Sequence, residues 1–296
     1  GNAFQQSGKY AQAIRDYDQA IKLDPKYAAA FTERANTYAL SGKIDRALQD
    51  YEQAIRFNPT YAGVYNSRAM LYQRRGDMKR AIADLDQAIK LDPTFAPALK
   101  TRGEIAMDRG DYDHAIADFS LAVTARPAFE GAWNSRGLAY KNKGQTEKAI
   151  ADFDQALKIN PEFGDALANR GVALEAIGYH DKAIKDLDQA IKLDADSAKA
   201  YNARGQAYIG KHDFDRAIAD LSQALRIDPK YAAAFNSRGL AYRSKGDSDR
   251  AIADFSQAAR LDPNYAMAYS NRDNAYFDKR DYDRAIADLN TAIKLN

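Results

Sequence analysis

The chain has 296 residues, no cysteine and a formal net charge of +2, from 43 Lys and Arg residues against 41 Asp and Glu residues. Without cysteine it cannot form disulfides, thiolate metal sites or a thiol nucleophile. The balanced, interspersed charges do not predict a nucleic-acid partner. No stretch approaches the roughly 18 consecutive apolar residues of a membrane helix, so no membrane insertion is expected.

A period of 34 residues runs through the sequence. Alanine occupies two columns of this period, from Ala13 to Ala285 and from Ala20 to Ala292. Seven of the eight prolines follow it, and Ala195 stands at the one skipped step: Pro25, Pro59, Pro93, Pro127, Pro161, Pro229 and Pro263. Such internal repetition predicts one structural unit per period, stacked along the chain.

Each period predicts two helices. The first shows a stripe in which large residues flank a small one at helical spacing, as in Tyr65, Ala69 and Tyr72. The small residue should let a second helix approach closely. A glycine such as Gly76 follows and suits the left-handed conformation at a helix end.

The second helix of each period carries a similar stripe, as in Ala81, Leu85 and Ala88. It ends before Asp-Pro or Asn-Pro, because proline lacks an amide hydrogen and disfavours helix in the residue before it. Each unit is therefore predicted to be a helical hairpin.

The pattern of each period resembles the tetratricopeptide repeat. Its order is a large residue, a small residue, an aromatic, an alanine, an aromatic or leucine, an alanine and a proline. The resemblance covers the whole chain and implies an all-α fold, a right-handed α-solenoid superhelix of stacked antiparallel helix pairs. It implies a single solenoid over residues 1–296. Its expected repeats are a partial repeat 1–27, full repeats 28–61, 62–95, 96–129, 130–163, 164–197, 198–231 and 232–265, and a last repeat 266–296.

The terminal repeats lack the polar outer face that keeps a solenoid soluble. The last helix, with Ile286, Leu289 and Ile293, repeats the interior pattern. We therefore expect either that the chain was cut from a longer protein or that end-to-end self-association covers its uncapped terminal repeats.

Two charged columns depart from the family pattern. An arginine precedes the small residue in all eight units that contain this position, from Arg34 to Arg272, and an aspartate follows 16 residues later, from Asp50 to Asp288. On a helical wheel these columns lie at facing edges of the two apolar arcs. We predict a ladder of Arg–Asp contacts within or between repeats; two unrelated solvated columns are the alternative.

Four single positions also depart from the pattern. Asp273 occupies the small-residue column, His212 and Arg280 replace turn glycines, and Ala106 replaces the aromatic residue of its first helix. We expect neighbouring side chains to fill the room beside Ala106; a small pocket is the alternative.

No arrangement for catalysis, a metal or a cofactor is found. His114, His180 and His212 lie in different units, and the carboxylates repeat with the structural period, whereas a catalytic pair should be singular. The glycines stand alone rather than in a phosphate-binding cluster. We expect a chain that is not an enzyme.

The resemblance places partner binding in a concave groove lined by first-helix residues one and five after the large residue. Amides beside apolar residues could hold an extended backbone and seat apolar side chains. The alternative is that the asparagines bond only along their own helix or to water. The candidates are Asn66, Met70, Lys100, Glu104, Asn134, Leu138, Val172, Asn202, Gln206, Asn236 and Leu240.

These observations predict a scaffold that binds a protein or an extended peptide. The alternatives are a substrate-recruiting arm of a larger enzyme, such as the repeat-containing glycosyltransferases, and a self-associating structural spacer. A soluble protein is expected, with a cytoplasmic location favoured over a periplasmic one.

Overall fold

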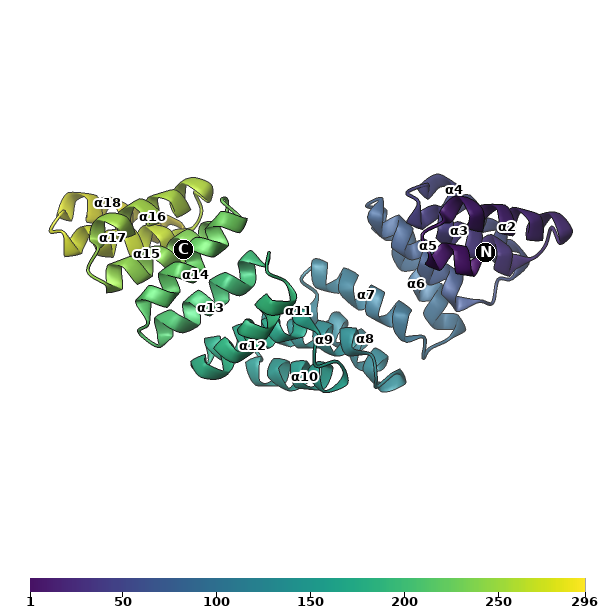
Figure 1. Cartoon of the computed structure of the whole chain (residues 1–296), viewed down its shortest axis with the longest axis horizontal. Coiled ribbons are helices and arrows are strands. Elements are labelled where there is room, and N and C mark those ends of the chain that lie inside the picture. The colour runs from purple at the N-terminus through teal and green to yellow at the C-terminus, as the bar shows by residue number, and fades with distance from the viewer. Residues whose placement is uncertain (296) are drawn as a thin grey trace. The chain divides into compact units, whose positions relative to one another are not determined.

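The computed structural model describes residues 1–295, and every regular element in that range is an α-helix (Figure 1). The chain divides into two compact units, Gly1–Lys143 and Gly144–Asn296. The first unit holds α1 (Asn2–Gln6), α2 (Tyr10–Leu23), α3 (Ala28–Leu40), α4 (Ile44–Phe57), α5 (Ala62–Arg74), α6 (Met78–Leu91), α7 (Ala96–Asp108), α8 (Tyr112–Ala125) and α9 (Glu130–Asn142). The second holds α10 (Thr146–Ile159), α11 (Gly164–Ala176), α12 (His180–Leu193), α13 (Ala198–Gly210), α14 (Phe214–Ile227), α15 (Ala232–Ser244), α16 (Ser248–Leu261), α17 (Ala266–Asp278) and α18 (Tyr282–Leu295).

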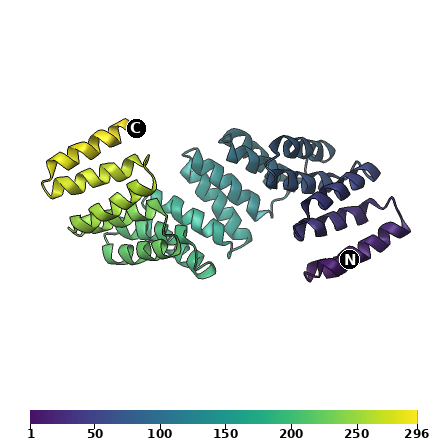
Figure 2. The same ribbon diagram turned by 90° about the horizontal axis from the view of Figure 1, so that it is seen from above.

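Within each unit the helices stack as antiparallel pairs, which Figure 2 shows from above. A first helix such as α5 packs against the second helix of its own repeat, α6, and against the second helix of the preceding repeat, α4. In the second unit α13 packs in the same way against α14 and α12. The predicted all-α solenoid of stacked helix hairpins is confirmed.

A small residue in every first helix from α3 to α15 allows the close approach of the paired helix. A Cβ atom placed on Gly205 would lie 2.7 Å from Cγ of Leu221, and one on Gly239 would lie 2.6 Å from Cε1 of Phe255. Both second-helix side chains are fully buried. The predicted role of the small-residue column is confirmed, since a side chain here would displace the largest core residues.

Except in the repeat that ends at Arg126, an aspartate or asparagine follows the second helix of each of the first eight repeats, and its side chain makes the turn. Asp24 Oδ1 accepts a hydrogen bond from the Lys26 amide at 3.0 Å, two residues further on. At the step where Ala195 replaces proline, Asp194 Oδ1 accepts the same bond from the Asp196 amide at 3.1 Å. The turn therefore persists without proline because the carboxylate bonds the backbone locally.

Seven arginines of the first helices form bidentate ion pairs with aspartates of their own repeat. In each pair, guanidinium Nε and Nη2 donate to the two carboxylate oxygens at 2.6–2.9 Å, and the aspartate is buried. The Arg–Asp ladder is thus confirmed, and its pairs include Arg34–Asp50, Arg68–Asp84, Arg102–Asp118, Arg170–Asp186, Arg204–Asp220, Arg238–Asp254 and Arg272–Asp288.

The third guanidinium nitrogen, Nη1, reaches the second helix of the preceding repeat. Arg204 Nη1 donates to Asp188 at 2.6 Å, and Arg238 Nη1 donates to the hydroxyl of Ser222 at 3.1 Å. The hydrogen bonds to Asp220 raise the pKa of the Arg204 guanidinium against the opposing effect of burial, and Asp188 adds to the rise. A ladder arginine therefore connects three helices.

The turn between the two helices of a repeat uses a left-handed residue. Seven glycines there have φ between +72° and +82°, whereas His212 and Arg280 hold φ of +60° and +62° at the equivalent positions. A side chain at such a position costs about 1–2 kcal/mol, because Cβ crowds the following carbonyl oxygen.

We therefore expect His212→Gly to raise the free energy of unfolding by about 1 kcal/mol, as measured by urea unfolding. The gain is reduced by loss of the edge-on contact between the rings of His212 and Phe214, whose centroids are 5.9 Å apart. Gly246→Ala, the reverse change at an equivalent turn, should lower stability. A destabilised His212→Gly variant would contradict this account of the turn.

Candidate partner-binding site

The four candidate asparagines lie buried beneath the surface of the first-helix layer. Asn66, Asn134, Asn202 and Asn236 are 3–8% exposed. Asn236 Oδ1 accepts a hydrogen bond at 2.9 Å from the amide of Asn271, in the next first helix. Asn236 therefore helps to join two successive first helices, and little of any of the four side chains reaches solvent.

The other candidates are at least partly exposed. Met70 is 45% exposed, whereas Leu138, Val172, Gln206 and Leu240 are half-buried. Gln206 donates to the hydroxyl of Ser237, in the next first helix, at 3.2 Å. Lys100 and Glu104 form a salt bridge along one helix. The exposed part of the candidate surface is thus mainly apolar, with Lys100 and Glu104 as its charged pair.

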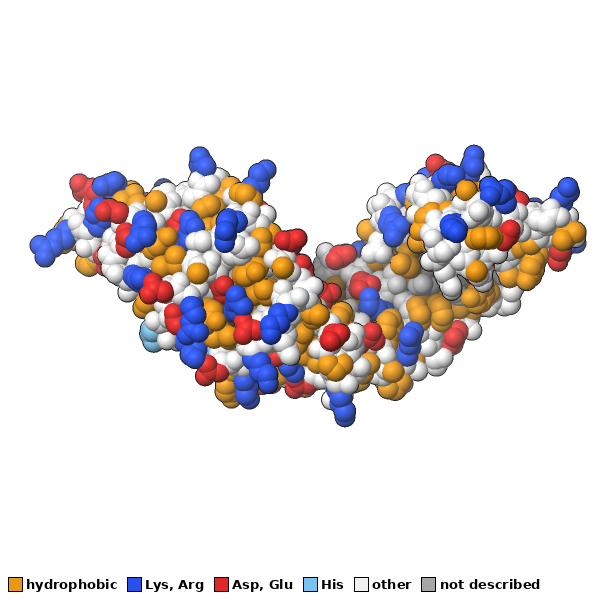
Figure 3. All heavy atoms as spheres, viewed as in Figure 1, with side chains coloured by type: hydrophobic (Ala, Val, Ile, Leu, Met, Phe, Trp, Pro, Cys, Tyr) orange, Lys and Arg blue, Asp and Glu red, His pale blue; other side chains and the backbone are white. Residues whose placement is uncertain are grey.

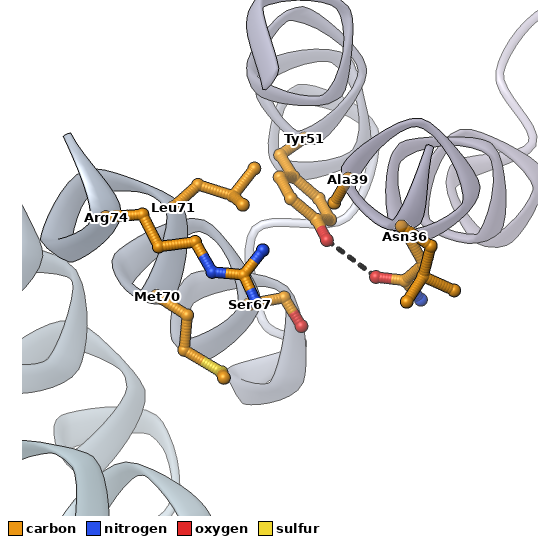
Figure 4. A pocket seen from close by; sticks show the side chains of 8 residues that line it. Asn36, Ala39, Tyr51, Ser67, Met70, Leu71 and Arg74 are labelled. Carbon is orange, nitrogen blue, oxygen red and sulfur yellow. Dashed lines mark hydrogen bonds between the residues drawn. The ribbon is translucent and has the colours of Figure 1, made fainter. Parts of the chain in front are cut away.

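A hollow of about 220 Å³ lies between first helices α3 and α5 (Figure 4). Met70 from the candidate list lines it, together with Asn36, Ala39, Leu40, Tyr51, Ser67, Leu71 and Arg74. Leu40 is 60% exposed at its edge. Apolar side chains with a few polar groups among them are the usual lining of a binding pocket.

Tyr51 reaches this hollow from the second helix α4. Its ring is buried, and its hydroxyl donates to Asn36 Oδ1 at 2.6 Å, as the dashed line in Figure 4 shows. Burial raises the pKa of Tyr51 to about 12. The tyrosine thus places a fixed phenol and a fixed amide at the floor of a mainly apolar hollow.

Sequence reasoning missed the pairing of Tyr51 with Asn36, although a signal was present. The preceding repeat carries the same two residue types at the same spacing, and there Tyr17 donates to Asn2. Most later repeats have leucine or phenylalanine in place of the tyrosine and lack the asparagine. A buried tyrosine hydroxyl needs a partner, so the joint occurrence could have identified the pair.

In the second unit, apolar side chains are exposed on the last first helix. Met267 and Phe277 of α17 project into solvent, and the Phe277 ring lies edge-on to Tyr282 with centroids 5.5 Å apart. The sequence analysis did not include either residue among its candidates. They extend the exposed apolar surface of the first helices beyond Leu240.

The histidines do not converge on one site. His114 is exposed and its Nδ1 lies 2.7 Å from Asp111 Oδ2, His180 packs beside Gly210, and His212 occupies a turn. Within residues 1–295 no three metal-ligating side chains gather around a common point. No helix in the described range is long and apolar enough to span a bilayer.

Charges of both signs are interspersed among apolar groups on the face drawn in Figure 3. Long-range attraction to a highly charged ligand needs a concentration of one sign. This face therefore gives no electrostatic preference for a cationic or an anionic partner.

These features define the chain as a helical repeat protein, an α-solenoid that presents one face of its first helices. Models of the TPR repeat match residues 1–42, 35–76 and 176–211. Tetratricopeptide repeat models match residues 62–95, 131–163, 202–266, 96–129 and 268–296. The chain belongs to the tetratricopeptide repeat family, with roughly nine repeats. No curated protein sequence matches it.

Solved structures share the fold. The hetero-tetramer Cut9–Hcn1 of the APC/C aligns with a TM-score of 0.69 at 20% identity, over 95% of this chain and 56% of that chain. A tetratricopeptide repeat protein from Parabacteroides merdae aligns with a TM-score of 0.62 at 19% identity, over 84% and 98%. YrrB, described as a TPR protein with an unusual peptide-binding site, aligns with a TM-score of 0.51 at 21% identity, over 62% and 95%. This chain thus spans little more than half of the Cut9–Hcn1 chain that it matches.

Tyr51→Phe should lower the free energy of unfolding at pH 7 by about 1 kcal/mol, because the partly buried Asn36 oxygen loses its donor. Between pH 10 and pH 12 the free energy of unfolding of the wild-type chain should fall by about 2 kcal/mol more than that of the variant. In that window the unfolded tyrosine releases its proton while the folded one, with its raised pKa, keeps it.

Urea unfolding at several pH values measures both effects, with Tyr61→Phe, which alters an exposed ring, as the control. Identical pH dependence in Tyr51→Phe and the wild-type chain would show that Tyr51 is not held protonated in the fold.

Proposed function

We propose that this chain is a non-catalytic scaffold that binds an extended peptide or a partner protein along the exposed face of its first helices. The observation that carries the proposal is the hollow between α3 and α5, where Leu40 and Met70 are exposed around the fixed Tyr51–Asn36 pair. Exposed apolar groups beside oriented polar groups can seat apolar side chains and fix the register of a bound segment.

Rigidity of the surface supports the proposal. The hydrogen bond between Asn236 and Asn271 joins two successive first helices, and the ladder fixes the helices behind them. A preformed surface binds more tightly because less conformational entropy is lost on association. The candidates Met70, Leu138, Val172, Gln206 and Leu240 would contact the partner, whereas the buried asparagines would hold the helices in place.

Membership of the family supports protein partners, and YrrB is described as having a peptide-binding site. Two alternatives make different predictions. A substrate-recruiting arm of a larger enzyme would use the same surface for an enzyme's substrate. A structural spacer would associate with copies of itself through its terminal repeats and bind no peptide.

Selection from a random peptide display library tests the proposal. Peptides selected on the wild-type chain should bind a Leu40→Asp/Met70→Asp variant at least about tenfold more weakly, since buried contact with two apolar anchors is lost. Leu193→Asp changes a leucine of similar exposure on a second helix and is the matched control. It should bind as the wild type does.

Equal binding by all three chains would move the site away from this surface. Failure to select any peptide, together with association that depends on protein concentration, would favour the structural spacer.

A further inference from the structure

In several repeats the last aromatic ring of the first helix lies between two arginines. The Tyr72 ring centroid is 5.8 Å from the ladder residue Arg68 and 4.6 Å from Arg80 of the second helix. Tyr242 lies likewise 5.8 Å from Arg238 and 4.4 Å from Arg250. A guanidinium near a ring face is attracted by the negative face of the ring. We call this arrangement the aromatic clamp.

The repeat formed by α7 and α8 keeps the ladder arginine of the clamp and lacks its ring. Ala106 stands at the ring position, while Arg102 keeps its bidentate bonds to Asp118 at 2.7–2.8 Å. His114 takes the place of the second-helix arginine. The expectation that neighbouring side chains would fill this room is wrong: a hollow of about 740 Å³ opens there.

The lining of this hollow is apolar where a ring would lie. Ile82, Ile105 and Ala106 contribute to it, and Leu121 adds an exposed edge. Leu121 itself departs from the repeat, because seven other repeats carry glutamine at its position: Gln19, Gln53, Gln87, Gln155, Gln189, Gln223 and Gln257. The apolar surface thus extends beyond the space of the missing ring.

The rim of the hollow also holds a cation without an ion pair. In five other repeats the residue at this turn position pairs with an acid 30 residues earlier, as Lys211 does with Asp181. For Arg109 that earlier residue is Lys79, and Arg109 makes no salt bridge within the described range 1–295. Its guanidinium is therefore available to contact the face of a ring.

We propose that this hollow is a binding site for the tyrosine side chain of a partner protein. The rest of the chain indicates the occupant, because six other repeats place their own tyrosine at this position, beside the same ladder arginine. The volume exceeds what one ring needs, and Leu121 extends the apolar surface outward, so a partner segment fits better than a free phenol. Ala106 is two residues from Glu104 and faces the opposite side of α7, so this site is separate from the proposed peptide-binding surface.

Binding of 4-methylphenol, the side chain of tyrosine, to the full chain tests the site. In a methyl-labelled sample, saturable shifts should appear at Ile82, Ile105 and Leu121. Ala106→Tyr supplies the internal ring and should abolish these shifts. Equal shifts in the wild type and Ala106→Tyr, or no shift at these methyls in the wild type, would overturn the proposal.

Tyr242→Ala empties a clamp in the second unit and should create a second binding site. The shifts should then appear at Ile252 of its own second helix and Ile218 of the preceding one.

A second ligand distinguishes a partner's side chain from a free phenol. N-acetyltyrosinamide should bind at least as tightly as 4-methylphenol, and Leu121→Gln should weaken the amide more than the phenol. If Leu121→Gln leaves both affinities unchanged, the assignment to a partner's tyrosine is wrong. Circular dichroism of each variant checks the fold, and Ala106→Tyr and Leu121→Gln each restore a residue that most repeats already carry.

Discussion

Each ladder arginine holds three helices through one rigid, planar group. Arg204 bonds both oxygens of Asp220 on the partner helix and reaches back to Asp188 on the preceding repeat. Taking two charges out of water is costly, and the attraction between them offsets that cost only when the geometry satisfies their hydrogen bonds. A bidentate guanidinium meets this condition where a lysine could not. The pair therefore specifies the rotation of the first helix relative to both second helices.

Because each ladder arginine fixes the packing of its helices, some surface positions of a repeat can change their residue and others cannot. The side of the first helix that carries the ladder and the small residue is nearly identical from repeat to repeat, because Gly205 or Gly239 can bear nothing larger and each ladder arginine needs its acid. Variation is concentrated on the opposite side of the first helix, where Met70 or Leu240 can change without disturbing the stack. It also occurs beside Ala106, where the ladder pair remains and only the ring has been removed. Both proposed binding sites lie where residues vary between repeats while the ladder pairs and the helix packing stay the same.

The repeat period, the helix hairpins and the ladder could be predicted from the sequence because each depends on spacing within one repeat. The burial of Asn66 and Asn202 could not be predicted, because it depends on how closely the next first helix approaches. The hollow beside Ala106 was expected to be filled, but its neighbours Arg102 and Asp118 are tied to each other and cannot collapse into it. The contribution of Tyr51 to the exposed face was missed because Tyr51 belongs to a second helix, α4, and reaches that face only between α3 and α5.

A double-mutant cycle at Arg204 and Asp220, measured by urea unfolding, tests most directly whether the buried pair fixes the helix packing. Replacing Arg204 by alanine should lower the free energy of unfolding by about 3 kcal/mol, because the buried carboxylate is left without its partner. Much of this loss should be absent when Asp220 is also replaced by alanine. The exposed pair Lys211–Asp181 gives the reference, for which a cost well below about 1 kcal/mol is expected. If Arg204→Ala lowers the free energy of unfolding no more than Lys211→Ala does, the ladder does not fix the helix packing.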